Sequence, residues 1–353
     1  MARLLYGVMG DAWGHVTSSL AIASRLPHHE IVFVGGGRAL ELARYGYSVV
    51  PVPIIGTKLA NQRVDTIATI KSGLATLRDR ARVVARLKAV IREFDPDLIL
   101  TDYEHFLPVA ARQLGRACIS ADHNHIVTHC RYQPPHGHWL GRTLTNASMR
   151  TLYSAASHYL IYSFVPIKPI DPGSTEIFPT VVRHEVESAH PRDGEDVVVY
   201  VRGTSLAWLR QLLTGRRRRF LIYGYDIEKE EGNLSFRKYS VEGFVADLTS
   251  CSYVICNGGN TVISEALYCG KPLLCLPVDL FYEQILNADL VAAAGYGLYC
   301  NAGPGAAAML SNFESGLPTF RRRIAEAVTS DRAAIISRLE SLIATRGATG
   351  RTG

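Results

Sequence analysis

A short apolar run followed by glycines and a helical pattern constrains the fold of this chain more strongly than any other feature. The run extends from Tyr253 to Cys256 and is followed directly by Asn257-Gly258-Gly259. An apolar run of this length, closed by glycines, is typical of a buried parallel strand that ends in a loop. We expect a helix to begin at about Asn260. Strand, glycine loop and helix in this order indicate an α/β architecture with parallel sheets.

The same alternation recurs along all 353 residues, which suggests two domains of ordinary size. Strands are expected in the first half at 4–9, 31–35, 49–53, 97–101 and 117–121, and in the second half at 196–201, 219–224, 234–239, 253–256, 272–276 and 298–300. Prolines punctuate the stretch from Ser163 to Pro172. We therefore expect domains at 1–163 and 164–318. The helices of residues 319–353 are expected to pack back on the first domain and to end in a frayed tail.

The glycine loop and its helix have the chemistry of a nucleotide site. Gly258 and Gly259 allow a ligand to approach the backbone closely, and the free N–H groups near Asn260 and Thr261 form an anion site that suits a diphosphate. One turn deeper, Glu265 can accept hydrogen bonds from both hydroxyls of a ribose. Glu283 and Gln284, after the next strand, can hold sugar hydroxyls. Taken singly, these residues could equally be helix caps or solvated helix positions.

Together, the elements between Asn257 and Gly297 resemble the donor-binding signature of the inverting two-domain glycosyltransferases of the GT-B fold. That superfamily includes the UDP-glycosyltransferases and the lipid-linked peptidoglycan N-acetylglucosaminyltransferase. The resemblance implies two Rossmann-like domains that face an interdomain cleft, an N-terminal acceptor domain and a C-terminal donor domain. Many members have His where this chain has Asn257, which puts a phosphate contact from that side chain in doubt. The segments Thr101–Glu104 and Cys118–His125 resemble a less characterised bacterial and archaeal branch.

The amino terminus repeats the pattern of strand, glycine loop and helix. Gly10 and Gly14 do not complete G-x-G-x-x-G, and the next strand, 30–34, does not end in an acidic residue, so the pattern disfavours NAD binding. The resemblance implies that His15, at the end of this loop, is the general base, with Asp102 as the residue that orients it. Asp102 ends an expected strand, where it could instead be a helix N-cap.

Further site residues are expected on both sides of the cleft. In the donor half, the loop at Gly203 and Thr204 is an anion-binding candidate or an ordinary cap, and the resemblance places backbone around Phe244 and Val245 against the nucleoside. Weaker candidates for the acceptor half are Trp13, Gly14, Glu104, His123 and His125. The histidines crowded between His123 and His138 raise the alternative of a zinc site, but their spacing is not that of a metal finger.

Charge and composition restrict the partners and the cell compartment that we expect for this protein. The net charge of +6 and the run Arg216–Arg219 occur without a recognised nucleic-acid module, so we expect no nucleic-acid partner. A basic amphipathic helix between about Ser72 and Phe94 is a solvated surface or a contact with an anionic membrane. Seven scattered cysteines and no apolar stretch of membrane-spanning length predict a cytoplasmic protein, soluble or peripheral at the inner membrane face.

The sequence therefore predicts an inverting glycosyltransferase that needs no metal or other cofactor. Its donor would be a nucleotide sugar, with UDP the most frequent carrier in the resembled families and dTDP or GDP still open. The acceptor could be a small molecule, a glycan or a lipid-linked sugar, and the oligomeric state is open. A nucleotide-sugar 2-epimerase of the same fold and a catalytically silent partner subunit are the two alternatives.

Overall fold

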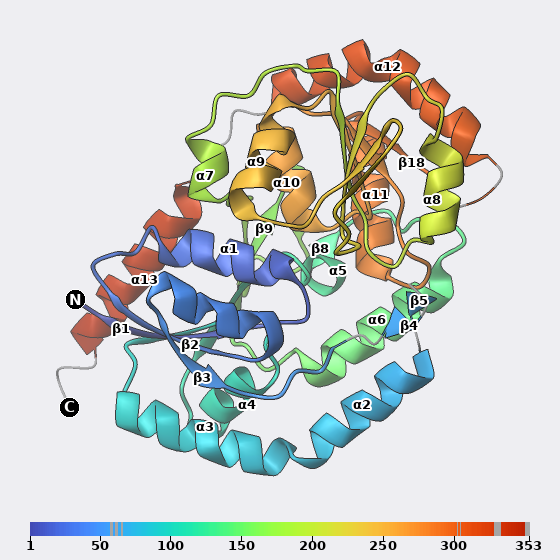
Figure 1. The fold of residues 1–353 in the computed structure, drawn as a ribbon. Coiled ribbons are helices and arrows are strands. Elements are labelled where there is room, and N and C mark those ends of the chain that lie inside the picture. The colour runs from blue at the N-terminus through green and yellow to red at the C-terminus, as the bar shows by residue number, and fades with distance from the viewer. Residues whose placement is uncertain are drawn as a thin grey trace.

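The computed structural model describes residues 1–56, 59–60, 63–64, 66–301, 303, 305–327 and 333–349. Two seven-stranded sheets, each flanked by helices, form the two halves of the molecule (Figure 1). The predicted α/β fold with two parallel, helix-covered sheets is confirmed.

The first sheet is parallel throughout, as is usual for a sheet with helices on both of its faces. Its strands are, in spatial order, β11 (Thr175–Pro179), β9 (His158–Ser163), β7 (Cys118–Asp122), β6 (Leu98–Asp102), β1 (Arg3–Val8), β2 (Glu30–Gly35) and β3 (Ser48–Pro51). Small antiparallel pairs are β8 (Cys130–Arg131) with β10 (Lys168–Pro169), and β4 (Leu59–Ala60) with β5 (Arg63–Val64).

Helices cover both faces of this sheet. Helix α1 (Trp13–Ala23) and the C-terminal helix α13 (Ala334–Thr349) pack on one face, and α3 (Arg80–Phe94) and α4 (Phe106–Gln113) pack on the other. The remaining helices of this half are the 3₁₀ helix η1 (Gly37–Tyr45), α2 (Thr66–Arg78), α5 (Ile126–His129) and α6 (Trp139–Leu152). The expected basic helix at 72–94 is thus two helices that meet at Asp79.

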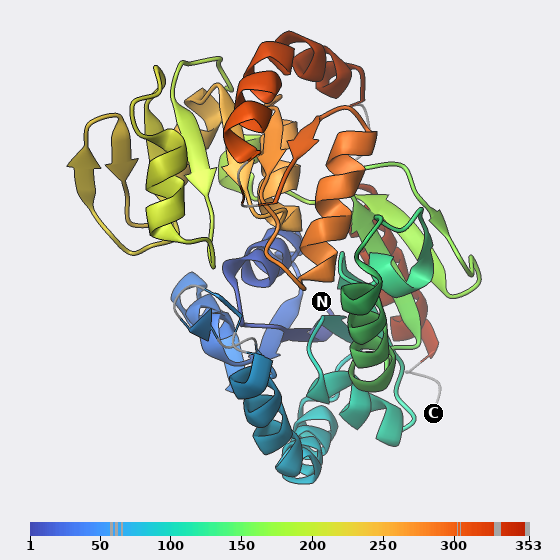
Figure 2. The same ribbon diagram turned by 90° about the vertical axis from the view of Figure 1, so that its right-hand side faces the viewer.

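The second sheet is parallel except for one edge strand. Its order is β14 (Lys229–Glu231), β15 (Leu234–Phe236), β13 (Phe220–Tyr223), β12 (Val197–Tyr200), β16 (Tyr253–Cys256), β17 (Leu273–Cys275) and β18 (Gly297–Tyr299), with β14 antiparallel to β15. On one face lie α9 (Val241–Ser250), α10 (Asn260–Tyr268) and α11 (Tyr282–Ala293), and on the other α8 (Leu206–Leu213) and most of α12 (Ala306–Ala327). Figure 2 shows this sheet and α12 above the first domain.

The chain changes domains later than the sequence indicated. The expected boundary at residue 163 falls at the end of β9, but β11 still belongs to the first sheet, so the chain leaves that sheet at Pro179. A connector with the short helix α7 (His184–Glu187) follows. Of the helices expected to return to the first domain, only α13 does so, because Ile335, Leu339 and Ile343 join the core of that domain (Figure 1). Helix α12 instead packs on the second sheet.

Candidate active site

The candidate catalytic pair lies where the two domains meet. Asp102 is the last residue of β6, at the carboxyl edge of the first sheet, and His15 lies in the first turn of α1. Nδ1 of His15 donates a hydrogen bond of 2.6 Å to Oδ1 of Asp102. The carboxylate is completely buried, whereas 19% of the His15 side chain is exposed. The sequence-predicted His–Asp pair is thus brought together, and its imidazole reaches the surface of the domain.

Two further hydroxyls hold the Asp102 carboxylate. Ser19 and Tyr162 both donate to Oδ2, at 3.1 and 3.2 Å. Burial disfavours the imidazolium of His15, but the charge and the hydrogen bond of Asp102 outweigh burial and raise the pKa of His15 to about 9. Neither hydroxyl was expected from the sequence. Ser19 was within reach, because it lies one helical turn after His15 on the same face of α1, whereas Tyr162 comes from β9 with no local signal.

Helix α10 of the second domain begins opposite His15. Gly258 adopts a φ of 90°, and a Cβ there would lie 2.6 Å from the carbonyl oxygen of Gln284, so only glycine fits between this loop and the first turn of α11. Thr261 Oγ1 donates to the carbonyl oxygen of Gly14 at 3.2 Å, which joins the start of α10 to the start of α1 (Figure 1). The expected anion site at Asn260 and Thr261 therefore faces the first domain.

Asn257 secures the loops around this helix terminus. Its Oδ1 accepts a hydrogen bond of 2.5 Å from the Arg202 N–H, and its Nδ2 donates to Thr204 Oγ1 at 3.1 Å and to the Leu276 carbonyl at 2.8 Å. These three hydrogen bonds all join residues of the second domain, and only 7% of the residue is exposed. Asn257 thus ties the Gly203–Thr204 loop to the ends of β16 and β17.

The two residues expected to contact the nucleoside from α9 are core residues. Phe244 and Val245 are buried in the core of the second domain, and the Phe244 N–H donates to the Ser240 carbonyl within the helix. Tyr239, just before α9, lies at the domain interface instead, where its ring stacks on Trp13 with centroids 6.0 Å apart. The Arg38 guanidinium lies over the Trp13 ring, 5.2 Å from its centroid.

Glu265 forms a buried ion pair with Arg183, a residue that the sequence did not indicate. It has no exposed surface, and Arg183 of the connector donates to both of its oxygens, from Nε at 2.6 Å and from Nη2 at 3.0 Å. Burial raises the pKa of Glu265, and the Arg183 charge opposes that shift. Arg183 also donates to the Tyr239 hydroxyl at 2.8 Å. A ribose can reach this carboxylate only if its surroundings rearrange.

Glu283 and Gln284 lie in the first turn of α11, near the candidate catalytic pair. The charge of Glu283 contributes to the raised pKa of His15 and of Tyr103, so its carboxylate acts on both across the domain interface. The Gln284 side chain bonds to the loop just before α11, where its Oε1 accepts a hydrogen bond from the Val278 N–H at 3.1 Å.

The weaker acceptor candidates are mostly engaged in internal contacts. His123 bonds to the Tyr162 carbonyl and to Oδ1 of Asn287 in the second domain, both at 2.8 Å, and is almost completely buried. His125 is equally buried and pairs with Asp122 at 2.7 Å. No group of three metal-ligating side chains occurs among the residues that the structure describes.

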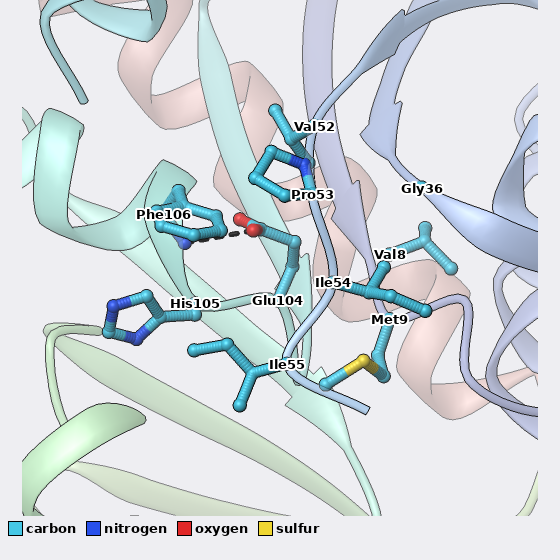
Figure 3. A pocket seen from close by; sticks show the side chains of 10 residues that line it. All are labelled: Val8, Met9, Gly36, Val52, Pro53, Ile54, Ile55, Glu104, His105 and Phe106. Carbon is cyan, nitrogen blue, oxygen red and sulfur yellow. Dashed lines mark hydrogen bonds between the residues drawn. The ribbon is translucent and has the colours of Figure 1, made fainter. Parts of the chain in front are cut away.

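Glu104 lies in a cavity of the first domain. Its carboxylate accepts the N–H groups of Phe106 and Leu107 at 2.8 and 2.6 Å and so caps α4. Burial raises the pKa of Glu104 to about 7. The cavity lies at the same sheet edge as His15, and Figure 3 shows its side chains: Val8, Met9, Val52, Pro53, Ile54, Ile55, Glu104, His105 and Phe106, with Gly36 beside them. Most of this lining is apolar.

Two domains, each built on a helix-flanked and mainly parallel sheet, have the architecture of the GT-B fold of glycosyltransferases. The chain belongs to glycosyl transferase family 1, because the model of that family matches residues 2–318. It is therefore a transferase enzyme, as the sequence predicted. Among curated protein sequences, none matches the chain.

Solved structures share the fold at low sequence identity. A glycosyltransferase of Streptomyces sp. SF2575, SsfS6, complexed with thymidine diphosphate, is 18% identical, with 97% of this chain and 100% of that chain covered and a TM-score of 0.64. UGT2 of Phytolacca americana, complexed with UDP-2fluoro-glucose and pterostilbene, is 12% identical, with 98% and 100% covered and a TM-score of 0.69. MurG of Acinetobacter baumannii is 14% identical, with 96% and 99% covered and a TM-score of 0.60.

Across the described part of the chain, the helices are all too short or too polar to cross a lipid bilayer.

Proposed function

We propose that this protein transfers a glycosyl group from a nucleoside diphosphate sugar to an acceptor hydroxyl, with inversion and without a metal ion. The 2.6 Å hydrogen bond between His15 and Asp102 carries the proposal, because it leaves Nε2 of the neutral imidazole as a base beside the start of α10. Solved structures of the same fold hold thymidine diphosphate or a UDP-sugar, which supports the donor class.

In the proposed reaction, the acceptor oxygen loses its proton to His15 Nε2 and forms a bond to the anomeric carbon. The bond from that carbon to the diphosphate oxygen breaks on the opposite face, which inverts the configuration. The leaving diphosphate would lie against the N–H groups at Asn260 and Thr261 and at the Gly203–Thr204 loop. Glu283 would hold the sugar, and Glu265 the ribose after Arg183 shifts.

Ligand-induced stabilisation tests the donor class first. UDP, dTDP and GDP are added to the wild-type protein, with and without magnesium, and a ligand at 100-fold its Kd should stabilise the fold by about 2.7 kcal/mol. Glu265→Gln, which keeps the shape of the side chain, should weaken binding of the responsive nucleotide, and exposed Glu242→Gln is the matched control. If no nucleotide changes the melting temperature, the donor site proposed here is wrong.

Turnover then separates the alternatives. The matching nucleotide sugar is incubated with and without acceptors in EDTA, and the anomeric configuration of the product is read by NMR. Consumption of donor with a change at C2 and without acceptor would identify an epimerase. Nucleotide binding without any turnover would favour a silent partner subunit.

A further inference from the structure

Tyr103 has an unusual backbone next to the candidate catalytic carboxylate. It directly follows Asp102 and adopts a φ of 56°, in the left-handed region that bulky side chains rarely enter. The neighbouring residues hold this conformation. Thr101 Oγ1 accepts the Glu104 N–H at 3.0 Å and donates to the Glu104 carbonyl at 3.2 Å, and the Asp102 carbonyl accepts the Met9 N–H at 3.0 Å.

The left-handed turn decides where the Tyr103 ring lies. Successive side chains of an extended strand point to opposite faces of the sheet, so an extended Tyr103 would point away from the face to which Asp102 points. In the structure its ring instead lies parallel to the His15 ring, with an interplanar angle of 6° and centroids 5.9 Å apart. Strained conformations of this kind are found at functional sites.

A second tyrosine, Tyr153, stacks on the Tyr103 ring. Tyr103 and Tyr153 stack with centroids 4.0 Å apart and an interplanar angle of 8°. His125 contacts the Tyr103 ring edge-on at 5.8 Å. His15, Tyr103 and Tyr153 thus form a row of three nearly parallel rings that joins the candidate base to α6 and the chain after it.

We propose that Tyr103 is a positioning residue that fixes the ring plane of His15 and so the direction of its Nε2 lone pair. This inference rests on the proposed function. The hydrogen bond to Asp102 fixes one atom of the imidazole and leaves the ring free to tilt about that contact. A parallel ring at stacking distance removes this freedom. Because a general base must point at the proton that it accepts, a tilted ring loses rate without losing donor affinity.

Four variants test the inference. Tyr103→Asn keeps a residue that tolerates the left-handed region but removes the ring, and Tyr103→Phe is the matched control that keeps the ring. Tyr153→Leu removes the supporting ring and leaves the Tyr103 backbone unchanged. Asp226→Gly, at an exposed residue with a φ of 53°, controls for the relief of backbone strain elsewhere.

We expect the loss of the ring to lower kcat and to leave nucleotide binding unchanged. Tyr103→Asn and Tyr153→Leu should lower kcat by about 10-fold or more, with nucleotide affinity unchanged and the NMR signal of His15 Hε1 shifted by loss of the ring. Tyr103→Phe and Asp226→Gly should keep the wild-type kcat and His15 signal. Wild-type kcat in both ring-deleting variants, or an equal loss in Tyr103→Phe, would overturn the inference. The proposed function is judged separately, by whether His15→Ala abolishes turnover and by nucleotide binding.

Discussion

Arg183 donates hydrogen bonds of 2.6 and 3.0 Å to the two carboxylate oxygens of Glu265, and the pair is buried between the connector and α10. The connector is the segment by which the chain passes from the first domain to the second. The pair therefore attaches this segment to the helix whose N-terminus is the proposed diphosphate site.

We expect the Arg183–Glu265 pair to couple strongly in stability measurements. Glu265→Gln leaves the Arg183 charge buried without its partner, which should reduce the free energy of unfolding by roughly 3 kcal/mol. Arg183→Met with Glu265→Gln should be more stable than Glu265→Gln alone, because neither change then leaves an unpaired charge. Urea unfolding of the two single variants and the double variant measures this. Additive losses would mean that the two residues do not interact in solution.

The His15–Asp102 pair should control turnover and not donor binding. His15→Ala removes the base and should lower kcat by about 10²- to 10⁴-fold. Asp102→Asn keeps the shape of the side chain but loses the charge that orients and stabilises the imidazolium, so it should also lower kcat. Nucleotide affinity by calorimetry should remain at the wild-type value in both variants. Exposed His136→Ala, shortly before α6, is a control that should leave kcat unchanged; a near-native kcat in His15→Ala would disprove the assignment.

The pKa of His15 predicts how activity depends on pH. Because the free enzyme holds the proton on His15 up to about pH 9, kcat/KM should rise with pH until it levels near that value. In Asp102→Asn, loss of the carboxylate charge should move the midpoint of this rise to lower pH. Initial rates between pH 6 and 10 measure the shift, and identical midpoints would show that another group controls the profile.

The same group links stability to pH. The folded-state pKa of His15, about 9, is above the unfolded value of about 6.5, so its contribution to stability is complete below about pH 6.5 and is lost as pH rises to about 9. His15→Gln should therefore lose more stability, relative to wild type, at pH 6 than at pH 9.5. Thermal unfolding at the two pH values tests the sign, and a constant difference would contradict it.

Asn257 should act on nucleotide affinity through the loops that it joins. Asn257→Ala removes its bonds to Arg202, Thr204 and Leu276, which should cost about 1–3 kcal/mol of stability. Freed from β16, the Gly203–Thr204 loop should bind the diphosphate more weakly. Calorimetric titration measures this, with Thr204→Val separating the single hydroxyl contact from the others. Unchanged affinity in Asn257→Ala would remove the Gly203–Thr204 loop from the proposed site.

The architecture of both sheets could be predicted because buried parallel strands are short apolar runs closed by turn residues. All eleven expected strands occur, whereas β9, β11 and β14 were missed. β14 is Lys-Glu-Glu, which lacks the composition of a strand. β9, His-Tyr-Leu-Ile-Tyr-Ser, has the composition of a buried strand, but it ends at the boundary that the prolines indicate. β11 lies beyond the proline-rich stretch that indicates a domain boundary, and only its pairing with β9 places it in the first sheet.

The sequence by itself determined the two parallel domains, the glycine loops and the place of His15 and Asp102 at strand and helix ends, because each depends on local pattern and chain direction. Only the tertiary structure decided which side chains meet them. Tyr162, Arg183 and Tyr103 reach the site through contacts between residues distant in sequence, and through one backbone turn at Tyr103 that no residue preference predicts. Such partners depend on how separate elements pack together, and packing follows from the whole core, not from any one segment.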